Sequence, residues 1–130
     1  MKISVWDLTE EWEKASSDGD TKATLITGVV IARNDFIEAH PDAVETFLQQ
    51  YEASVNYVND NVADAAVLVG NYDIVAAQVA EKAIPECNIT FIAGNDMKEK
   101  LSSYLGILLE QNPAAVGGAL PNDDFYYNAD

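Results

Sequence analysis

The sequence predicts an α/β protein that is rich in helix and contains few strands. Residues 24–32 (TLITGVVIA) form a β-branched and almost uninterrupted apolar run, which is typical of a strand covered on both faces. Residues 42–59 and 96–111 carry apolar side chains at helical spacing. Because helical and extended segments follow one another along the chain, we expect part of an α/β layer architecture.

The predicted elements near the amino terminus are short. Residues 3–6 (ISVW) alternate weakly between apolar and polar side chains and predict a short strand. Residues 9–14 (TEEWEK) predict a helical turn, for which Thr9 or Asp7 can act as the N-cap. Residues 16–20 (SSDGD) predict a loop that leads into the apolar run.

The middle of the chain predicts one strand followed by two helices. Gly28 lies in the centre of the apolar strand and indicates a bulge or a close backbone approach. Residues 34–40 predict a short helix, and Pro41 ends it and opens the next one. The helix predicted for residues 42–59 has one apolar face, formed by Val44, Phe47, Leu48, Tyr51, Val55 and Val58.

The second half of the chain predicts three more helices and an extended segment. Asn61 can cap a helix that continues to about residue 69, where glycine and asparagine end it. A further helix is expected over residues 75–83, before a proline. Residues 88–92 (NITFI) have the composition of a short extended segment. The last long helix is expected over residues 96–111.

The signals around this last helix are local. Asp96 and Glu99 form an acidic variant of the capping box at its start. Asn-Pro at residues 112–113 ends it, and residues 114–118 predict a turn. The aromatic residues 125–127 (FYY) either pack back on the body of the protein or leave an exposed patch.

Length and charge narrow the function classes. The chain has 130 residues, the size of one domain, and we expect residues 1–130 to form a single domain. Twenty-two acidic and seven basic residues give a net charge of −15. The chain therefore lacks the basic surface that a nucleic-acid-binding protein needs. Anionic membranes would also repel it. The acidity favours solubility. Cys87 is the one cysteine, which excludes an internal disulfide.

No residue pattern predicts catalysis. His40 is the one histidine, so the sequence predicts no metal cluster, and we expect it to face solvent or to cap a helix. The carboxylates of residues 10–13 (EEWE) are expected to form a solvated face. Those of residues 123–124 could bind a hard cation, but two acidic residues in a tail are weak evidence for a cation site. The glycine pair at residues 117–118 lacks the lysine of a phosphate loop. We therefore expect no enzyme activity and no cofactor.

Several motifs occur in a defined order. They are DLTEEW at residues 7–12, TGVVI at 27–31, RNDF at 33–36, HPDAV at 40–44 and the ending GGALP…FYY at 117–127. Together they resemble the carboxy-terminal portion of substrate-binding proteins of ABC importers. The branch that they resemble serves the uptake of nitrate, sulfonate, taurine and thiamine precursors.

The resemblance implies a helix-rich fragment of the type II periplasmic-binding-protein fold from which the first lobe is absent. The parent would bind a small-molecule ligand for an ABC permease, in the periplasm or lipid-anchored at the cell surface. The first residues of this chain do not form an export signal, because Asp7 and Glu10 interrupt any apolar core. By resemblance, Asp7, Thr27 and Gly28 lie near the ligand cleft; a strand kink without ligand contact is the alternative for Thr27 and Gly28.

Two functions follow as hypotheses. The chain is a solute-binding component of an ABC importer, or a truncated fragment of one. The alternative is a stand-alone acidic interaction or structural module without a ligand. In a fragment, the strand of residues 24–32 would lose its cover, and we expect it to be the seam of a homodimer or higher oligomer.

Overall fold

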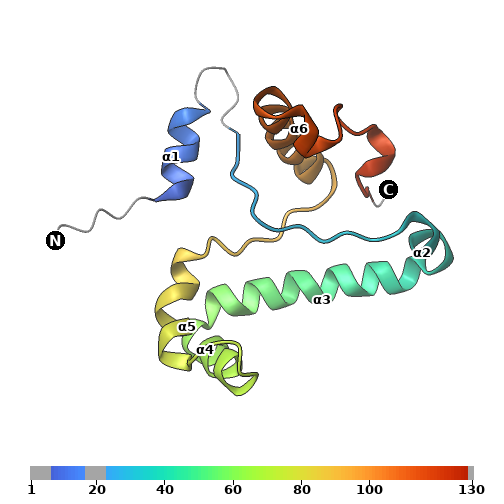
Figure 1. Ribbon diagram of the computed structural model, residues 1–130. Helices are drawn as coiled ribbons and strands as arrows, with labels where there is room; N and C mark the ends of the chain where they lie inside the picture. Colours follow the sequence, from blue (N-terminus) through green and yellow to red (C-terminus); the bar gives the residue numbers. More distant parts are fainter. Residues whose placement is uncertain (1–6, 17–22, 129–130) are drawn as a thin grey trace. The chain divides into compact units, whose positions relative to one another are not determined.

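The computed structural model describes residues 7–16 and 23–128, and every regular element in these residues is helical. In chain order they are α1 (Leu8–Ala15), α2 (Asn34–Ala39), α3 (Pro41–Asp60), α4 (Val62–Asn71), α5 (Ala77–Ala83), the short 3₁₀ helix η1 (Ile84–Glu86), α6 (Gly94–Gln111), and the 3₁₀ helices η2 (Pro113–Val116) and η3 (Asp123–Phe125) (Figure 1).

The chain divides into two compact units. Residues 31–91 form one of them, which we call the central unit, with helices α2 to α5 and η1. The residues up to 30 and from 92 onward form the other, which we call the terminal unit, with α1, α6, η2 and η3. Each unit is described separately below, and the expectation of a single domain stays a prediction.

The predicted α/β class is wrong for the residues that the structure describes, because none of them forms a strand. Residues 24–32 follow an open, non-helical path (Figure 1), and no backbone hydrogen bond joins them to another described residue. A strand exists only where a neighbouring backbone pairs with its N–H and C=O groups. Residues 88–92 are likewise not a strand. The expected strand of residues 3–6 lies outside the described residues.

Helix α3 confirms the helix predicted for residues 42–59. It begins with Pro41 in its first turn, where the missing N–H costs nothing because the first helical N–H groups have no partner within the helix. His40 occupies the N-cap position without a side-chain hydrogen bond to the helix. Asn61 separates α3 from α4, and its side-chain amide donates back to the carbonyl of Tyr57 at 3.1 Å. The Asn61 side chain therefore provides a hydrogen bond to a carbonyl in the last turn of α3, and it makes no side-chain cap on α4.

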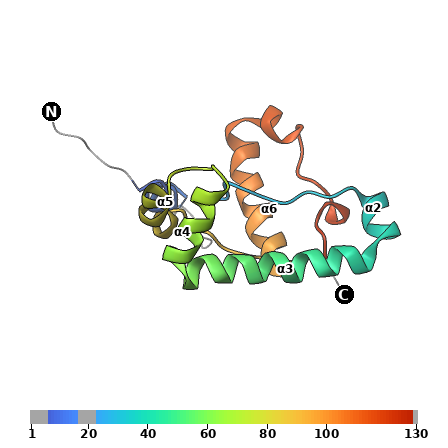
Figure 2. The ribbon, with the colours of Figure 1, turned by 90° about the horizontal axis from the view of Figure 1, so that it is seen from below.

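Small side chains form the core of the central unit. Ala66 of α4 is 2% exposed, and Gly70 lies so close to α5 that an added Cβ would be 3.1 Å from the Cβ of Ala77. Small residues let the axes of two helices approach closely, and Figures 1 and 2 show α5 alongside α4. The core cluster consists of Ala65, Ala66, Ala80 and Ile84, with Val58, Val62, Val69 and Ile89 partly buried against it.

The terminal unit begins with a capped helix. The Asp7 carboxylate accepts hydrogen bonds from the backbone N–H groups of Thr9 at 2.9 Å and Glu10 at 3.2 Å, so the predicted N-cap is confirmed. The ring of Trp12 packs against Tyr104 of α6 with 5.3 Å between the ring centroids. The partly buried indole of Trp12 therefore joins α1 to α6.

Helix α6 confirms the helix predicted for residues 96–111, although not its start. Ala93 occupies the N-cap position and makes no side-chain cap, whereas Asp96 lies inside the first turn and pairs with Lys100. The expected acidic capping box is therefore wrong. In this i,i+4 ion pair the acidic residue precedes the lysine, which is the order that stabilises a helix. Because the Asp96 carboxylate binds Lys100, it does not cap the helix.

The carboxy-terminal tail packs back on α6. Tyr126 is buried, and the Ser102 hydroxyl donates to its phenolic oxygen at 2.9 Å. The Lys98 ammonium lies 2.9 Å from the Asp123 carboxylate. Phe125 remains exposed. The sequence left open whether the aromatic ending packs back on the protein or stays exposed. Tyr126 packs back on α6, whereas Phe125 stays exposed.

Candidate interaction surface

The turn between α4 and α5 presents large apolar side chains to solvent. Tyr72 is 78% exposed and Ile74 is 72% exposed. Between them, Asp73 adopts a φ of +53°, a left-handed conformation that aspartate tolerates better than a β-branched residue does. The Ile74 N–H donates to the carbonyl of Val69 at 3.2 Å, and the Asp73 N–H to that of Gly70 at 3.1 Å. The turn is thus closed by its own backbone.

The exposed side chains continue from the turn onto both helices. We call this set the hairpin surface: Val67, Leu68, Tyr72, Ile74, Val75 and Val79. The helices that carry it meet each other through alanine, so the small side chains lie inside and the large ones outside. Single exposed apolar side chains are common on folded domains, so the number of large ones along this hairpin is the informative feature. Several large exposed apolar side chains along one turn and its two helices are typical of an association site.

A second apolar feature is formed by two rings of α3 and one ring of the segment that follows η1. We call it the aromatic row: Phe47, Tyr51 and Phe91. The rings of Phe47 and Tyr51 are stacked at 5.6 Å, and Phe91 meets Tyr51 edge-on at 5.8 Å. Phe47 is 46% and Tyr51 40% exposed, although Val44 and Val55 on the same predicted face are buried. The apolar face of α3 is therefore covered near its ends and open between them.

The charge around both features is mostly negative, and Lys82 in the last turn of α5 is the basic exception. Residues 34–81 contain no lysine or arginine. Their acidic residues are Asp35, Glu38, Asp42, Glu45, Glu52, Asp60, Asp64, Asp73 and Glu81. The helices of the central unit consequently present an anionic surface with apolar side chains set into it.

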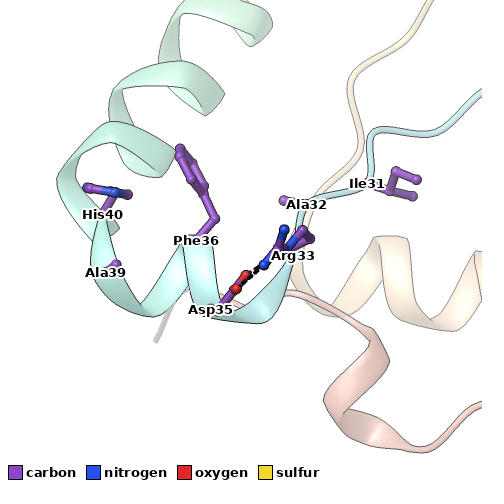
Figure 3. Close-up of a pocket in the computed structure, with 7 residues that line it drawn as sticks. All are labelled: Ile31, Ala32, Arg33, Asp35, Phe36, Ala39 and His40. Atoms are coloured by element: carbon purple, nitrogen blue, oxygen red, sulfur yellow. Dashed lines mark hydrogen bonds and ion pairs between the residues drawn. The ribbon is translucent and has the colours of Figure 1, made fainter.

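A hollow of about 530 Å³ lies beside α2 (Figure 3). It is lined by Ile31, Ala32, Arg33, Asp35, Phe36, Ala39 and His40. Figure 3 shows the Arg33 guanidinium turned to the Asp35 carboxylate, and the Nε–Oδ1 distance is 2.9 Å. The exposed His40 ring lies 4.9 Å from the ring of Phe36. The charge of Arg33 is thus balanced by Asp35, and the rest of the described lining consists of apolar side chains and the imidazole of His40.

The predicted ligand-binding residues lie in two separate segments of the terminal unit. Asp7 caps α1 with its carboxylate. Thr27 and Gly28 lie in the unpaired segment of residues 24–32. Apart from Gly28 itself and its two chain neighbours, no described residue has an atom within 4 Å of a Cβ placed on Gly28. The expected bulge or close backbone approach at Gly28 is therefore wrong. No hydrogen bond or ion pair among the described residues joins these three residues, and their role in ligand binding stays a prediction.

Other candidate chemistry is limited to single groups. Within residues 7–16 and 23–128 no group of three or more His, Cys, Asp or Glu side chains could hold a metal ion. Cys87 is exposed with a free thiol. The Glu11 carboxylate, through a hydrogen bond and its charge, raises the pKa of Lys14. None of the helices in the described part is long and apolar enough to cross a membrane.

Sequence reasoning missed the hairpin surface. A local signal was present, because Tyr72 and Ile74 flank Asp73 directly after Gly70 and Asn71, where the helix was expected to end. Large apolar residues within a turn have no helix face through which to be buried. Comparison of the chain with protein-family models, with curated protein sequences and with solved structures found no match.

Proposed function

We propose that this chain is an acidic helical association module that binds a second copy of itself through the hairpin surface. The supporting observation is the sorting of side chains in the hairpin, with alanines between α4 and α5 and the large apolar residues outside. Tyr72 and Ile74 are the expected anchors, because large side chains at a protruding turn fill pockets of a partner at little conformational cost. This proposal assigns binding rather than catalysis.

Charge and burial act in opposite directions on this association. The net charge of −15 makes two copies repel each other. Salt screens exposed charges beyond about 8 Å at physiological ionic strength, whereas burial of apolar surface persists. A fully buried valine, leucine or isoleucine contributes roughly 1.5–3 kcal/mol. We therefore expect association to be weak in low salt and to strengthen as salt is added.

Replacing Tyr72 and Ile74 together with serine should abolish the association or weaken it at least about tenfold, the equivalent of roughly 1.4 kcal/mol. Sedimentation equilibrium and light scattering at tens of micromolar measure it directly. Both side chains are exposed, so circular dichroism should show an unchanged helix content. Tyr57→Ser, at an exposed aromatic on α3, is the matched control and should leave association unchanged. A monomeric wild-type chain at all salt concentrations contradicts the proposal.

We also propose the solute-receptor function, which the order of the five sequence motifs supports. In that function the parent protein binds a small ligand for an ABC permease, with Asp7, Thr27 and Gly28 as the cleft residues of this chain. Sequencing of the gene's surroundings tests this function. We expect upstream coding sequence for an export signal and a first lobe, with permease and ATPase genes beside it. Calorimetry should then detect weak or no ligand binding by this chain alone, and an isolated complete reading frame counts against the receptor function.

A further inference from the structure

We infer that the aromatic row on α3 binds a basic amphipathic helix of another protein. This goes beyond self-association, since both the surface and the partner differ from those of the hairpin surface. The apolar part of the inference comes from Phe47 and Tyr51, which are stacked on each other and open to solvent between the buried Val44 and Val55. Phe91 closes one side edge-on. Helix faces of this kind bind the apolar side of a second helix.

The charge of the partner follows from the carboxylates beside the row. At 100° per residue, Glu45 and Glu52 lie on one flank of the apolar face, two helical turns and roughly 10 Å apart along the axis. Gln49 donates to Glu45 at 3.2 Å, and no lysine or arginine of the described residues forms an ion pair with either glutamate. A partner helix with lysines or arginines seven residues apart matches this spacing.

The same charges argue against other occupants of the row. A second copy fits the row less well than a basic helix does, because residues 34–81 contain no lysine or arginine and would place further carboxylates near Glu45 and Glu52. Among the residues that the structure describes, four basic side chains pair with acids of the same chain: Lys14, Arg33, Lys98 and Lys100. Nucleic acids and anionic lipid surfaces are repelled by the acidic flank. The partner must therefore carry positive charges that complement the glutamates. It must also have an apolar side that packs on the aromatic rings, so it is amphipathic.

A synthetic helical peptide of about 18 residues tests the inference. It carries leucine at positions i, i+3, i+7 and i+10 and lysine seven residues apart on the flank, with a fluorescent label for anisotropy titration against the full chain. One control peptide has the same composition in scrambled order, and another has glutamate in place of lysine. We expect binding of the amphipathic lysine peptide only, with an affinity that falls as salt is raised.

Matched variants assign the binding to the row. Phe47→Ala and Tyr51→Ala should each weaken the peptide at least about tenfold. Tyr57→Ala removes a similarly exposed ring from another face of α3 and should change the affinity less than twofold. Glu52→Gln should weaken binding severalfold at low salt and less at high salt, whereas Asp60→Asn, away from the row, should not.

Each outcome decides the inference. Equal affinity for the scrambled peptide shows attraction to the net charge alone and overturns it. Absence of binding also overturns it, as is expected if another segment of the chain or a second copy occupies the row in solution. An equal effect of Tyr57→Ala and Tyr51→Ala places the peptide elsewhere. The Tyr72 and Ile74 variant should bind the peptide normally, so failure of self-association and failure of this inference are separable.

Discussion

Replacing Ala66 with phenylalanine is expected to lower the free energy of unfolding of the central unit by roughly 3 kcal/mol, the upper end of the cost of overpacking. Ala66 is 2% exposed and lies in the core between α4 and α5, whose close approach leaves no room for a ring. The hairpin must therefore open or shift. Chemical denaturation followed by circular dichroism measures the loss, and hydrogen exchange should be faster over residues 62–86.

The matched control is Ala63→Phe. Ala63 belongs to the same helix but is exposed, so a ring at this position meets solvent and should change the stability by no more than about 0.5 kcal/mol. Both variants carry the same small difference in helix propensity. If the two substitutions cost the same, the alanines of α4 do not form the interface that the structure shows.

Local signals were sufficient to predict the long helices. Pro41 opens α3, and an apolar residue every three or four positions predicts its face, which the structure confirms at Val44 and Val55. Asn112 follows the last residue of α6, as the Asn-Pro pair predicted. Each of these signals acts within a few residues, so no knowledge of the rest of the fold is required.

The strand prediction was wrong because it required a partner that composition does not specify. Residues 24–32 have the side chains of a buried strand, yet no described segment pairs with their backbone. The α/β class depended on that pairing. The same limit explains Asp96, which the sequence analysis assigned to a capping box and which instead forms an ion pair with Lys100.

The interaction surface could not be predicted for a different reason. Helix α4 (VADAAVLVGN) has apolar residues nearly all round, so periodicity does not choose which side is buried. The structure buries Ala65 and Ala66 against α5 and leaves Val67 and Leu68 outside. Close approach of the two helices favours the small side chains, and that preference becomes visible only when α5 is in place. The aromatic row likewise includes Phe91, forty residues from Tyr51 in sequence.

Truncation of Tyr126 to alanine is expected to have an effect of similar size in the terminal unit. The ring is 8% exposed, and its hydroxyl accepts a hydrogen bond from Ser102 of α6. Loss of a buried aromatic ring costs about 3 kcal/mol or more, since both the transfer free energy and a cavity contribute. The tail beyond η2 should then detach from α6. Hydrogen exchange over residues 119–128 and denaturant unfolding followed by circular dichroism measure the two effects.

Two further variants separate the ring from its hydroxyl. Tyr126→Phe keeps the packing and removes one hydrogen bond, so it should cost about 1 kcal/mol. Phe125→Ala, next in sequence but exposed, should cost at most about 0.5 kcal/mol. The tail is anchored by burial of a single ring if the three substitutions rank in this order. Equal effects of Phe125→Ala and Tyr126→Ala would contradict the anchoring and would indicate a tail held by the aromatic pair as a whole, in which the two rings meet edge-on at 5.3 Å.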